Sequence, residues 1–348
     1  MENNELFIER KNFMNGLIRL FKNDNFNTEN GKVISIDGEW GIGKTFFKDK
    51  FKGELENEKF IVMEYNAWEN DYEEDPFPSL VGNMVSQMES FNKSSDVEKV
   101  INNIKTNSLK ILKELMPVLV VGLAKYFGVE EVFKIFEEAK EGTKIITKNI
   151  TEIIFDYNKK EKTIEDFKNS MSDFRIEYTQ YKQSLEIDSP ERRSKVIILI
   201  DELDRCKPNY ALKVLERIKH FFNIPDYIFV FLNNKKQIES TVNSIYGIKN
   251  GDVYLEKFYD LELNLPVPDK KEFINMLIEN NFENSDYDLF ERFLFDAFKF
   301  YFVDSDLSLR VIEKSFIYYK TIVDLKPNFR TFFETLSFPL FFFEKIFN

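Results

Sequence analysis

The sequence is poor in the residues on which several kinds of site depend. Cysteine and histidine each occur once in 348 residues, as Cys206 and His220. A disulfide framework within the chain, a cysteine-rich zinc site and a multi-histidine metal site are therefore excluded. Glycine is scarce too, with 12 residues, so any cluster of glycines stands out from the background.

A basic surface and a long apolar run are also missing. Lysine and arginine total 48 against 60 aspartates and glutamates, a net charge of −12. Because phosphate backbones are bound by basic surfaces, this balance argues against a general nucleic-acid coat and leaves only a local basic groove open. The longest apolar run, 115–124, has ten residues, whereas a bilayer-spanning helix needs ~20. We expect a buried helix there and a soluble, cytoplasmic protein, with peripheral membrane association left open.

Apolar segments of two kinds follow one another along the chain. Short apolar runs predict strands at 33–37, 60–65, 196–201, 227–232 and 259–265. Apolar residues at helical spacing predict helices at 5–22 and 211–222, and the order strand, helix, strand indicates a parallel βαβ unit. Charged segments with helical periodicity run from about 79 to 190, and further helices follow Pro268. We therefore predict an α/β fold with a discontinuous core, 1–89 and 190–268, a helical insert, 90–189, and a helical C-terminal domain, 269–348.

A glycine-containing segment follows the first predicted strand. Residues 38–45 read GEWGIGKT and satisfy the phosphate-loop pattern G-x-x-x-x-G-K-[ST] at every required position. In such a loop, backbone N–H groups surround a phosphate, Lys44 bridges the β- and γ-phosphate oxygens, and Thr45 offers its hydroxyl to Mg²⁺. We expect nucleotide contacts from the loop and from the residue after it, namely Gly38, Trp40, Gly41, Ile42, Gly43, Lys44, Thr45 and Phe46.

Two carboxylates stand at the end of the apolar run 196–201. Asp201 is the residue type and position expected to hold Mg²⁺, and Glu202 is expected to polarise the attacking water. The strand-like segment 60–65 precedes this run and follows the phosphate loop in the chain. That order favours the P-loop class in which one additional strand separates the phosphate-loop strand from the acidic strand and a glutamate activates water.

The residues after the predicted strand 227–232 bear on the choice of nucleotide. Asn234-Lys235-Lys236-Gln237 begins like the guanine-reading pattern N-K-x-D but has Gln237 in place of the carboxylate that would accept hydrogen bonds from guanine. ATP is therefore favoured over GTP. Asn234 either senses the γ-phosphate or the attacking water, or serves only the turn.

Five segments together carry a resemblance to a known family. They are GEWGIGKT at 38–45, YNAW at 65–68, DELDRC at 201–206, YLEKF at 254–258 and LSLR at 307–310. In this combination the chain resembles the KAP family of P-loop NTPases over about 33–312. The resemblance implies a nucleotide-dependent switch or assembly ATPase with a helical C-terminal lid, using ATP and Mg²⁺. It also implies a homo-oligomer or a partner protein, and several bacterial members are linked to defence against phage.

The chain departs from many family members at two places. Many carry transmembrane helices in the segment that corresponds to 90–190, where this chain has only its short apolar run. Asn234 stands where many members have aspartate, which bears on the sensor and on the rate of hydrolysis.

Several roles are left open by the sequence. Arg310 either contacts the γ-phosphate from the lid or is a surface or structural residue. Arg205 either pairs with Asp204 or Asp201 or reaches a neighbouring subunit, and Trp68 is expected to pack in the core. We predict ATP hydrolysis with four residues in the catalytic set, Glu202, Lys44, Asn234 and Arg310. The alternative is a nucleotide-gated scaffold that does not hydrolyse.

Overall fold

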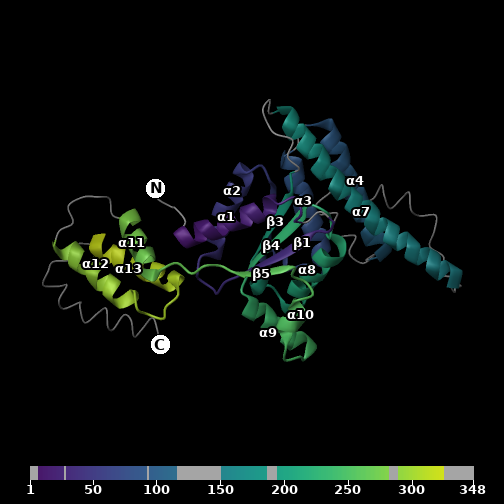
Figure 1. Cartoon of the computed structure of the whole chain (residues 1–348). Helices are drawn as coiled ribbons and strands as arrows, with labels where there is room; N and C mark the ends of the chain where they lie inside the picture. The colour runs from purple at the N-terminus through teal and green to yellow at the C-terminus, as the bar shows by residue number, and fades with distance from the viewer. Residues whose placement is uncertain are drawn as a thin grey trace. The chain divides into compact units, whose positions relative to one another are not determined.

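A computed structural model describes residues 7–26, 29–91, 94–115, 150–185, 194–281 and 289–324 (Figure 1). The chain divides into two compact units. The sheet unit comprises Lys11–Glu39 and Lys44–Leu265, and the helical unit comprises Met1–Arg10, Trp40–Gly43 and Pro266–Asn348. Domain boundaries predicted from the sequence stay a prediction.

The sheet unit is built on one five-stranded sheet in which all strand pairs are parallel. Its strands are β1 (Lys32–Asp37), β2 (Ile61–Asn66), β3 (Val196–Asp201), β4 (Tyr227–Asn233) and β5 (Leu261–Asn264). Every residue of β3 and β4 is buried. Parallel strands are covered on both faces, which is why continuous apolar runs, and not alternating ones, predicted them. The predicted α/β fold is confirmed.

The strand order corrects one detail of the sequence interpretation. In the sheet the order is β2-β3-β4-β1-β5. One strand does separate β1 from β3, as predicted, but that strand is β4. The segment that suggested the separation forms β2 and lies at the edge of the sheet, outside β3.

Aromatic side chains join the helices that cover the sheet to one another. On one face, α1 (Ile8–Lys22) and α2 (Lys44–Asn57) meet through ring contacts that join Phe13 to Phe47 and Phe21 to Phe51. On the other, α3 (Pro76–Phe91) and α8 (Pro208–Phe221) pack through Phe77 and Phe221. Two further helices, α9 (Lys235–Tyr246) and α10 (Gly251–Leu255), lie between β4 and β5 in the chain. Each fully buried Phe contributes roughly 2–3 kcal/mol of burial free energy.

The described part of the predicted insert consists of two long helices, α4 (Ser95–Leu115) and α7 (Ile150–Leu185), which run side by side (Figure 1). Phe167 of α7 contacts Phe77 and Phe222, so the insert shares the core of the sheet unit. Within the described residues, no helix is long and apolar enough to cross a membrane. The helix predicted at 115–124 lies outside them from residue 116 onward.

The helical unit has its own small apolar core. Its helices are α11 (Lys270–Asn281), α12 (Leu289–Phe302) and α13 (Leu309–Asp324). Ile274, Phe298, Phe302 and Phe316 are buried in one cluster, and the ring centroids of Phe298 and Phe316 lie 5.4 Å apart. Phenylalanine side chains thus form contacts between these helices.

Candidate nucleotide site

The carboxyl ends of the parallel strands bring Asp201 and the polar residues that end the neighbouring strands to one edge of the sheet. Asp37 at the end of β1 is in register with Asn233, and Asp201 at the end of β3 is in register with Asn66. The phosphate-loop sequence begins directly after β1, where the N–H of Gly38 donates to Asn233 O at 3.0 Å. At the other end of this sequence, α2 begins at Lys44. The first N–H groups of α2 have no helical partner and suit an anion.

Two glycines give the middle of the loop its conformation. Gly41 and Gly43 have φ values of +84° and +88°, a region that costs other residues roughly 1–2 kcal/mol. Within the helical unit, a Cβ added to Gly41 would lie 2.8 Å from the Cβ of Arg310. A Cβ added to Gly43 would lie 3.1 Å from Nη1 of Arg10. Position 41 therefore requires glycine for conformation and space, and position 43 requires it for conformation.

The ammonium of Lys44 is held by the backbone that precedes the glycine turn. Its Nζ donates to the carbonyl oxygen of Gly38 at 2.6 Å and to that of Glu39 at 3.3 Å. Burial lowers the pKa of Lys44, although the charges of Asp204 and Asp201 oppose this effect. An anion that approached the loop would relieve the penalty on this partly buried cation.

Thr45 and Asp201 come together although 156 positions separate them in the chain. The hydroxyl of Thr45 donates to Oδ2 of Asp201 at 3.2 Å, and Oδ1 of Asp201 accepts the N–H of Glu202 at 2.9 Å. Asp201 is only 5% exposed, and burial raises its pKa, opposed by the nearby charge of Lys48. A hydroxyl and a carboxylate are oxygen ligands of the kind that Mg²⁺ takes. No group of three or more His, Cys, Asp or Glu that could hold a metal occurs among the described residues, so an ion here would complete its shell with phosphate and water oxygens.

Two residues beside this pair were not predicted from the sequence. Lys48 lies one turn after Lys44 in α2, with its Nζ 3.1 Å from Oε1 of Glu64 and 3.8 Å from Oδ2 of Asp201. Burial opposes the charge on Lys48, but hydrogen bonding and the charge of Glu64 outweigh it and raise the pKa of Lys48. Two features of the sequence could have indicated these residues: the lysines of α2 recur every four residues, and Glu64 is a single acid within an apolar strand.

Glu202 has a left-handed backbone and a charged partner. Its φ is +62°, unusual for a residue other than glycine. Its carboxylate forms an ion pair with Nη1 of Arg205 at 2.8 Å, and the guanidinium of Arg205 lies 5.6 Å from the ring centroid of Trp68. The partners expected for Arg205 did not include Glu202. The prediction that Trp68 packs in the core is wrong, because its side chain is 50% exposed and lies against this cation.

The asparagines at the strand ends differ in what they bind. Asn66 accepts hydrogen bonds from the N–H groups of Trp68 and Glu69, which fixes the turn after β2. Asn233 is fully buried and bonds the hydroxyls of Ser35 and Tyr259, each at 3.4 Å. Asn234 is 7% exposed and precedes α9 without a side-chain capping bond. Its carbonyl oxygen accepts the N–H groups of Gln237 at 3.0 Å and Ile238 at 3.3 Å, so both roles of Asn234, sensor and turn residue, stay predictions.

Two arginines of the helical unit contact the glycine turn. The N–H of Arg310 donates to the carbonyl oxygen of Gly41 at 3.0 Å, while its side chain is exposed. Arg10 is 2% exposed and donates to the carbonyl oxygens of Ile42, of Gly43 at 3.5 Å and of Pro266 at 2.9 Å. Burial lowers the pKa of Arg10 to about 10. Arg10 was not predicted, although it interrupts the apolar stripe of α1.

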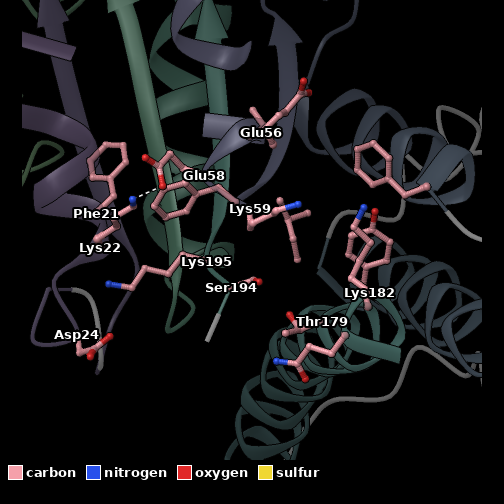
Figure 2. Close-up of a pocket in the computed structure, with 16 residues that line it drawn as sticks. Phe21, Lys22, Asp24, Glu56, Glu58, Lys59, Thr179, Lys182, Ser194 and Lys195 are labelled. Carbon is pink, nitrogen blue, oxygen red and sulfur yellow. Dashed lines mark hydrogen bonds and ion pairs between the residues drawn. The ribbon is translucent and has the colours of Figure 1, made fainter. Parts of the chain in front are cut away.

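A pocket of about 410 Å³ lies at the opposite end of the sheet (Figure 2). Its lining includes Ile61 and Lys195 at the amino ends of β2 and β3, and Lys182 of α7. Lys195 already donates to the carbonyl oxygens of Asn23 and Phe26, both at 2.7 Å. This pocket is therefore separate from the phosphate loop, which leaves the carboxyl ends of the strands.

Comparison with known proteins identifies a family for the chain. The model of the KAP family P-loop domain matches residues 10–317. The chain belongs to this family. The phage T7 exclusion protein of Escherichia coli K12 is 27% identical over 75 residues, which are 22% of this chain and 10% of that protein. The match thus spans about a tenth of its length. A structure of the Aeropyrum pernix ORC2 protein in ADPNP and ADP complexes aligns with a TM-score of 0.41 and 13% identity, over 91% of this chain and 64% of that chain.

Proposed function

We propose that this KAP-family protein is a Mg²⁺-dependent ATPase that acts as a nucleotide-driven switch or assembly factor. The supporting observation is the 3.2 Å contact between Thr45 and Asp201 directly after a P-loop sequence. This contact brings a hydroxyl and a carboxylate together at the carboxyl end of a parallel sheet, which supports their assignment as ligands of a nucleotide-bound cation. The positive φ of Gly41 and Gly43 in the preceding turn supports a loop whose backbone N–H groups bind phosphate oxygens.

The residues of the loop divide the binding of ATP between them. Lys44 exchanges its carbonyl partners for β- and γ-phosphate oxygens, and the backbone N–H groups of Thr45 and Phe46 at the start of α2 face the phosphates. Gly38, Trp40 and Ile42 complete the loop. Thr45 and Asp201 would hold Mg²⁺, which would neutralise charge on the β- and γ-phosphates.

Hydrolysis requires a water positioned against the γ-phosphorus. Glu202 accepts a proton from this water as its oxygen bonds to phosphorus and the bond to the bridging oxygen breaks, which yields ADP and phosphate. Asn234 orients the water or the γ-phosphate. Arg310, in the C-terminal helical lid, stabilises the developing charge and links lid position to the bound nucleotide.

Biological context extends this proposal beyond the site. We infer a cytoplasmic protein that works as a homo-oligomer or with a partner protein. In this proposal, the conformations of the insert, 90–189, and of the lid, 269–348, depend on the nucleotide bound to the core, 1–89 and 190–268. The partial similarity to a phage exclusion protein supports a role in defence against phage. The net charge of −12 speaks against a nucleic-acid-driven motor.

One observation favours a second candidate, a nucleotide-gated scaffold without turnover. The carboxylate of Glu202 is engaged by Arg205 at 2.8 Å. If nucleotide binding leaves this pair intact, no carboxylate reaches the water, and ATP or ADP only stabilises one arrangement of the chain.

Phosphate release and nucleotide binding, measured in parallel with ATP and GTP, separate the two candidates. We expect the wild type to bind and hydrolyse ATP, Lys44→Ala to lose binding, and Glu202→Gln to bind without turnover. Lys99→Ala removes an exposed lysine of α4 and serves as the charge control. Equal binding by all variants would refute the phosphate-loop assignment. Binding without turnover by the wild type, alone and at concentrations that drive assembly, would favour the scaffold.

A further inference from the structure

A row of lysines on α2 faces the acids of the two neighbouring strands. Lys44, Lys48 and Lys52 recur every four residues, so their side chains lie along one side of the helix. Glu64 projects from β2, and Asp201 stands at the end of β3, the strand paired with β2. The phosphate-loop lysine is therefore the first of several cations along this face.

Lys48 is shared between the two acids. Its Nζ lies 3.1 Å from Oε1 of Glu64 and 3.8 Å from Oδ2 of Asp201, and its side chain is 15% exposed. Lys52 forms an ion pair with the other oxygen of Glu64 and is 34% exposed. Lys52 thus has the same helix, spacing and acidic partner as Lys48, and its ion pairs do not include Asp201.

The oxygen that Lys48 approaches is the one that Thr45 also uses. Oδ2 of Asp201 accepts the hydroxyl of Thr45 at 3.2 Å and lies 3.8 Å from the ammonium of Lys48. A cation held by Thr45 and Asp201 would meet this ammonium at close range. Because like charges repel strongly in a partly buried setting, Lys48 and the cation compete for one carboxylate.

We propose that Lys48 is a positioning residue that orients Asp201 before the nucleotide arrives and weakens the binding of Mg²⁺ at Thr45 and Asp201. When Mg²⁺ replaces Lys48 at Asp201, Lys48 stays paired with Glu64. The inference rests on the proposed function, because it concerns the affinity of the same site for its metal. The consequence is a site that binds Mg²⁺ poorly by itself and fills when phosphate oxygens supply additional ligands.

The test is the dependence of nucleotide affinity on free Mg²⁺, measured by displacement of a fluorescent ATP analogue over buffered Mg²⁺ concentrations. In Lys48→Met we expect the Mg²⁺ midpoint to fall by roughly tenfold, a change equivalent to ~1.4 kcal/mol, and nucleotide affinity in EDTA to weaken. In Glu64→Gln the lysine loses its other acid and turns to Asp201, so the midpoint should rise. Lys52→Met should stay within about twofold of the wild type, since it leaves Asp201 untouched.

The outcomes distinguish this inference from the function on which it rests. If nucleotide affinity of the wild type does not respond to Mg²⁺, the metal-dependent function fails and the inference fails with it. If the wild type responds and Lys48→Met and Lys52→Met shift alike, only the inference is overturned. Lys48→Arg keeps the charge and should retain the wild-type midpoint, while Lys48→Gln should follow Lys48→Met. If Lys48→Met does not fold, the comparison of Lys48→Arg with Lys48→Gln tests the role of Lys48.

Discussion

The carboxylate of Glu202 is bound by the guanidinium of Arg205, three residues further along the chain, at 2.8 Å. Glu202 follows directly on Asp201, and its φ of +62° turns the chain sharply at this point. Arg205 in turn lies against the half-exposed ring of Trp68. The proposed general base is thus held by a cation that rests on a solvent-accessible aromatic surface.

Removal of that cation should free the glutamate. We expect Arg205→Gln to raise the rate of phosphate release by up to about fivefold, because a partly exposed ion pair contributes up to about 1 kcal/mol. ATP affinity should change little. Arg19→Gln, which removes an exposed arginine of α1, is the control. Slower release at unchanged ATP affinity would instead assign Arg205 to the transition state.

The positive φ of Gly41 leads to a prediction about the loop. Gly41→Ala places a Cβ 2.8 Å from the Cβ of Arg310 at a φ of +84°. We expect unfolding free energy to fall by about 1–3 kcal/mol and nucleotide binding to be lost, because the loop must leave its conformation. Gly53→Ala in α2 is the matched control. A Cβ there meets nothing within 4 Å, so this change should stabilise by up to about 1 kcal/mol. Equal melting temperatures for both variants would refute the argument.

Strands and loops that depend on neighbouring residues in the chain could be predicted from the sequence. Strand order and contacts between side chains that are distant in the chain could not. The strands β1 and β3, the loop between β1 and α2, and Asp201 each carry a local pattern, and all were found. The position of β4 between β1 and β3 was not found, because strand order is set by tertiary packing. The ion pair between Lys48 and Glu64 joins a helix to a strand 16 residues away, and no periodicity predicts such a partner.

The charge of Glu64 predicts a dependence of stability on pH. Burial alone would raise its pKa, but hydrogen bonds from Lys52 and Lys48 outweigh burial and lower it from its ordinary value of 4.5. Because the pKa of Glu64 is lowered in the folded state, its carboxylate stabilises the protein at pH values above about 4.5. This contribution disappears as the pH falls through the lowered pKa. Glu64→Gln should therefore reduce unfolding free energy at neutral pH by less than about 1 kcal/mol, since the pair is partly solvated.

Urea denaturation of wild type and Glu64→Gln at several pH values, without Mg²⁺ or nucleotide, measures this difference. The two curves should converge in acid. A difference that is constant from neutral pH to pH 3 would show that Glu64 contributes through packing and not through charge. Glu54→Gln, on the same side of the sheet in α2, controls for the loss of a carboxylate elsewhere.

A buried ion pair joins the insert to the sheet. Asp226, fully buried with a φ of +65°, precedes β4, and its Oδ2 lies 3.4 Å from Nη2 of Arg175 in α7. Arg175→Met would remove the guanidinium from this buried carboxylate, which costs about 3–5 kcal/mol. Asp226→Asn removes the charge, and asparagine, like aspartate, tolerates the left-handed conformation.

A double-mutant cycle separates the pair from its surroundings. We expect the double variant Arg175→Met with Asp226→Asn to be more stable than Arg175→Met alone, because the buried negative charge is then removed as well. Thermal unfolding of the four proteins gives the coupling energy directly. Additive effects of the two substitutions would mean that Arg175 and Asp226 act independently, and the contact at 3.4 Å would then contribute nothing to the anchoring of α7. A coupling of about 1 kcal/mol or more would show that the long insert helix is held to the start of β4 by charge as well as by its apolar contacts.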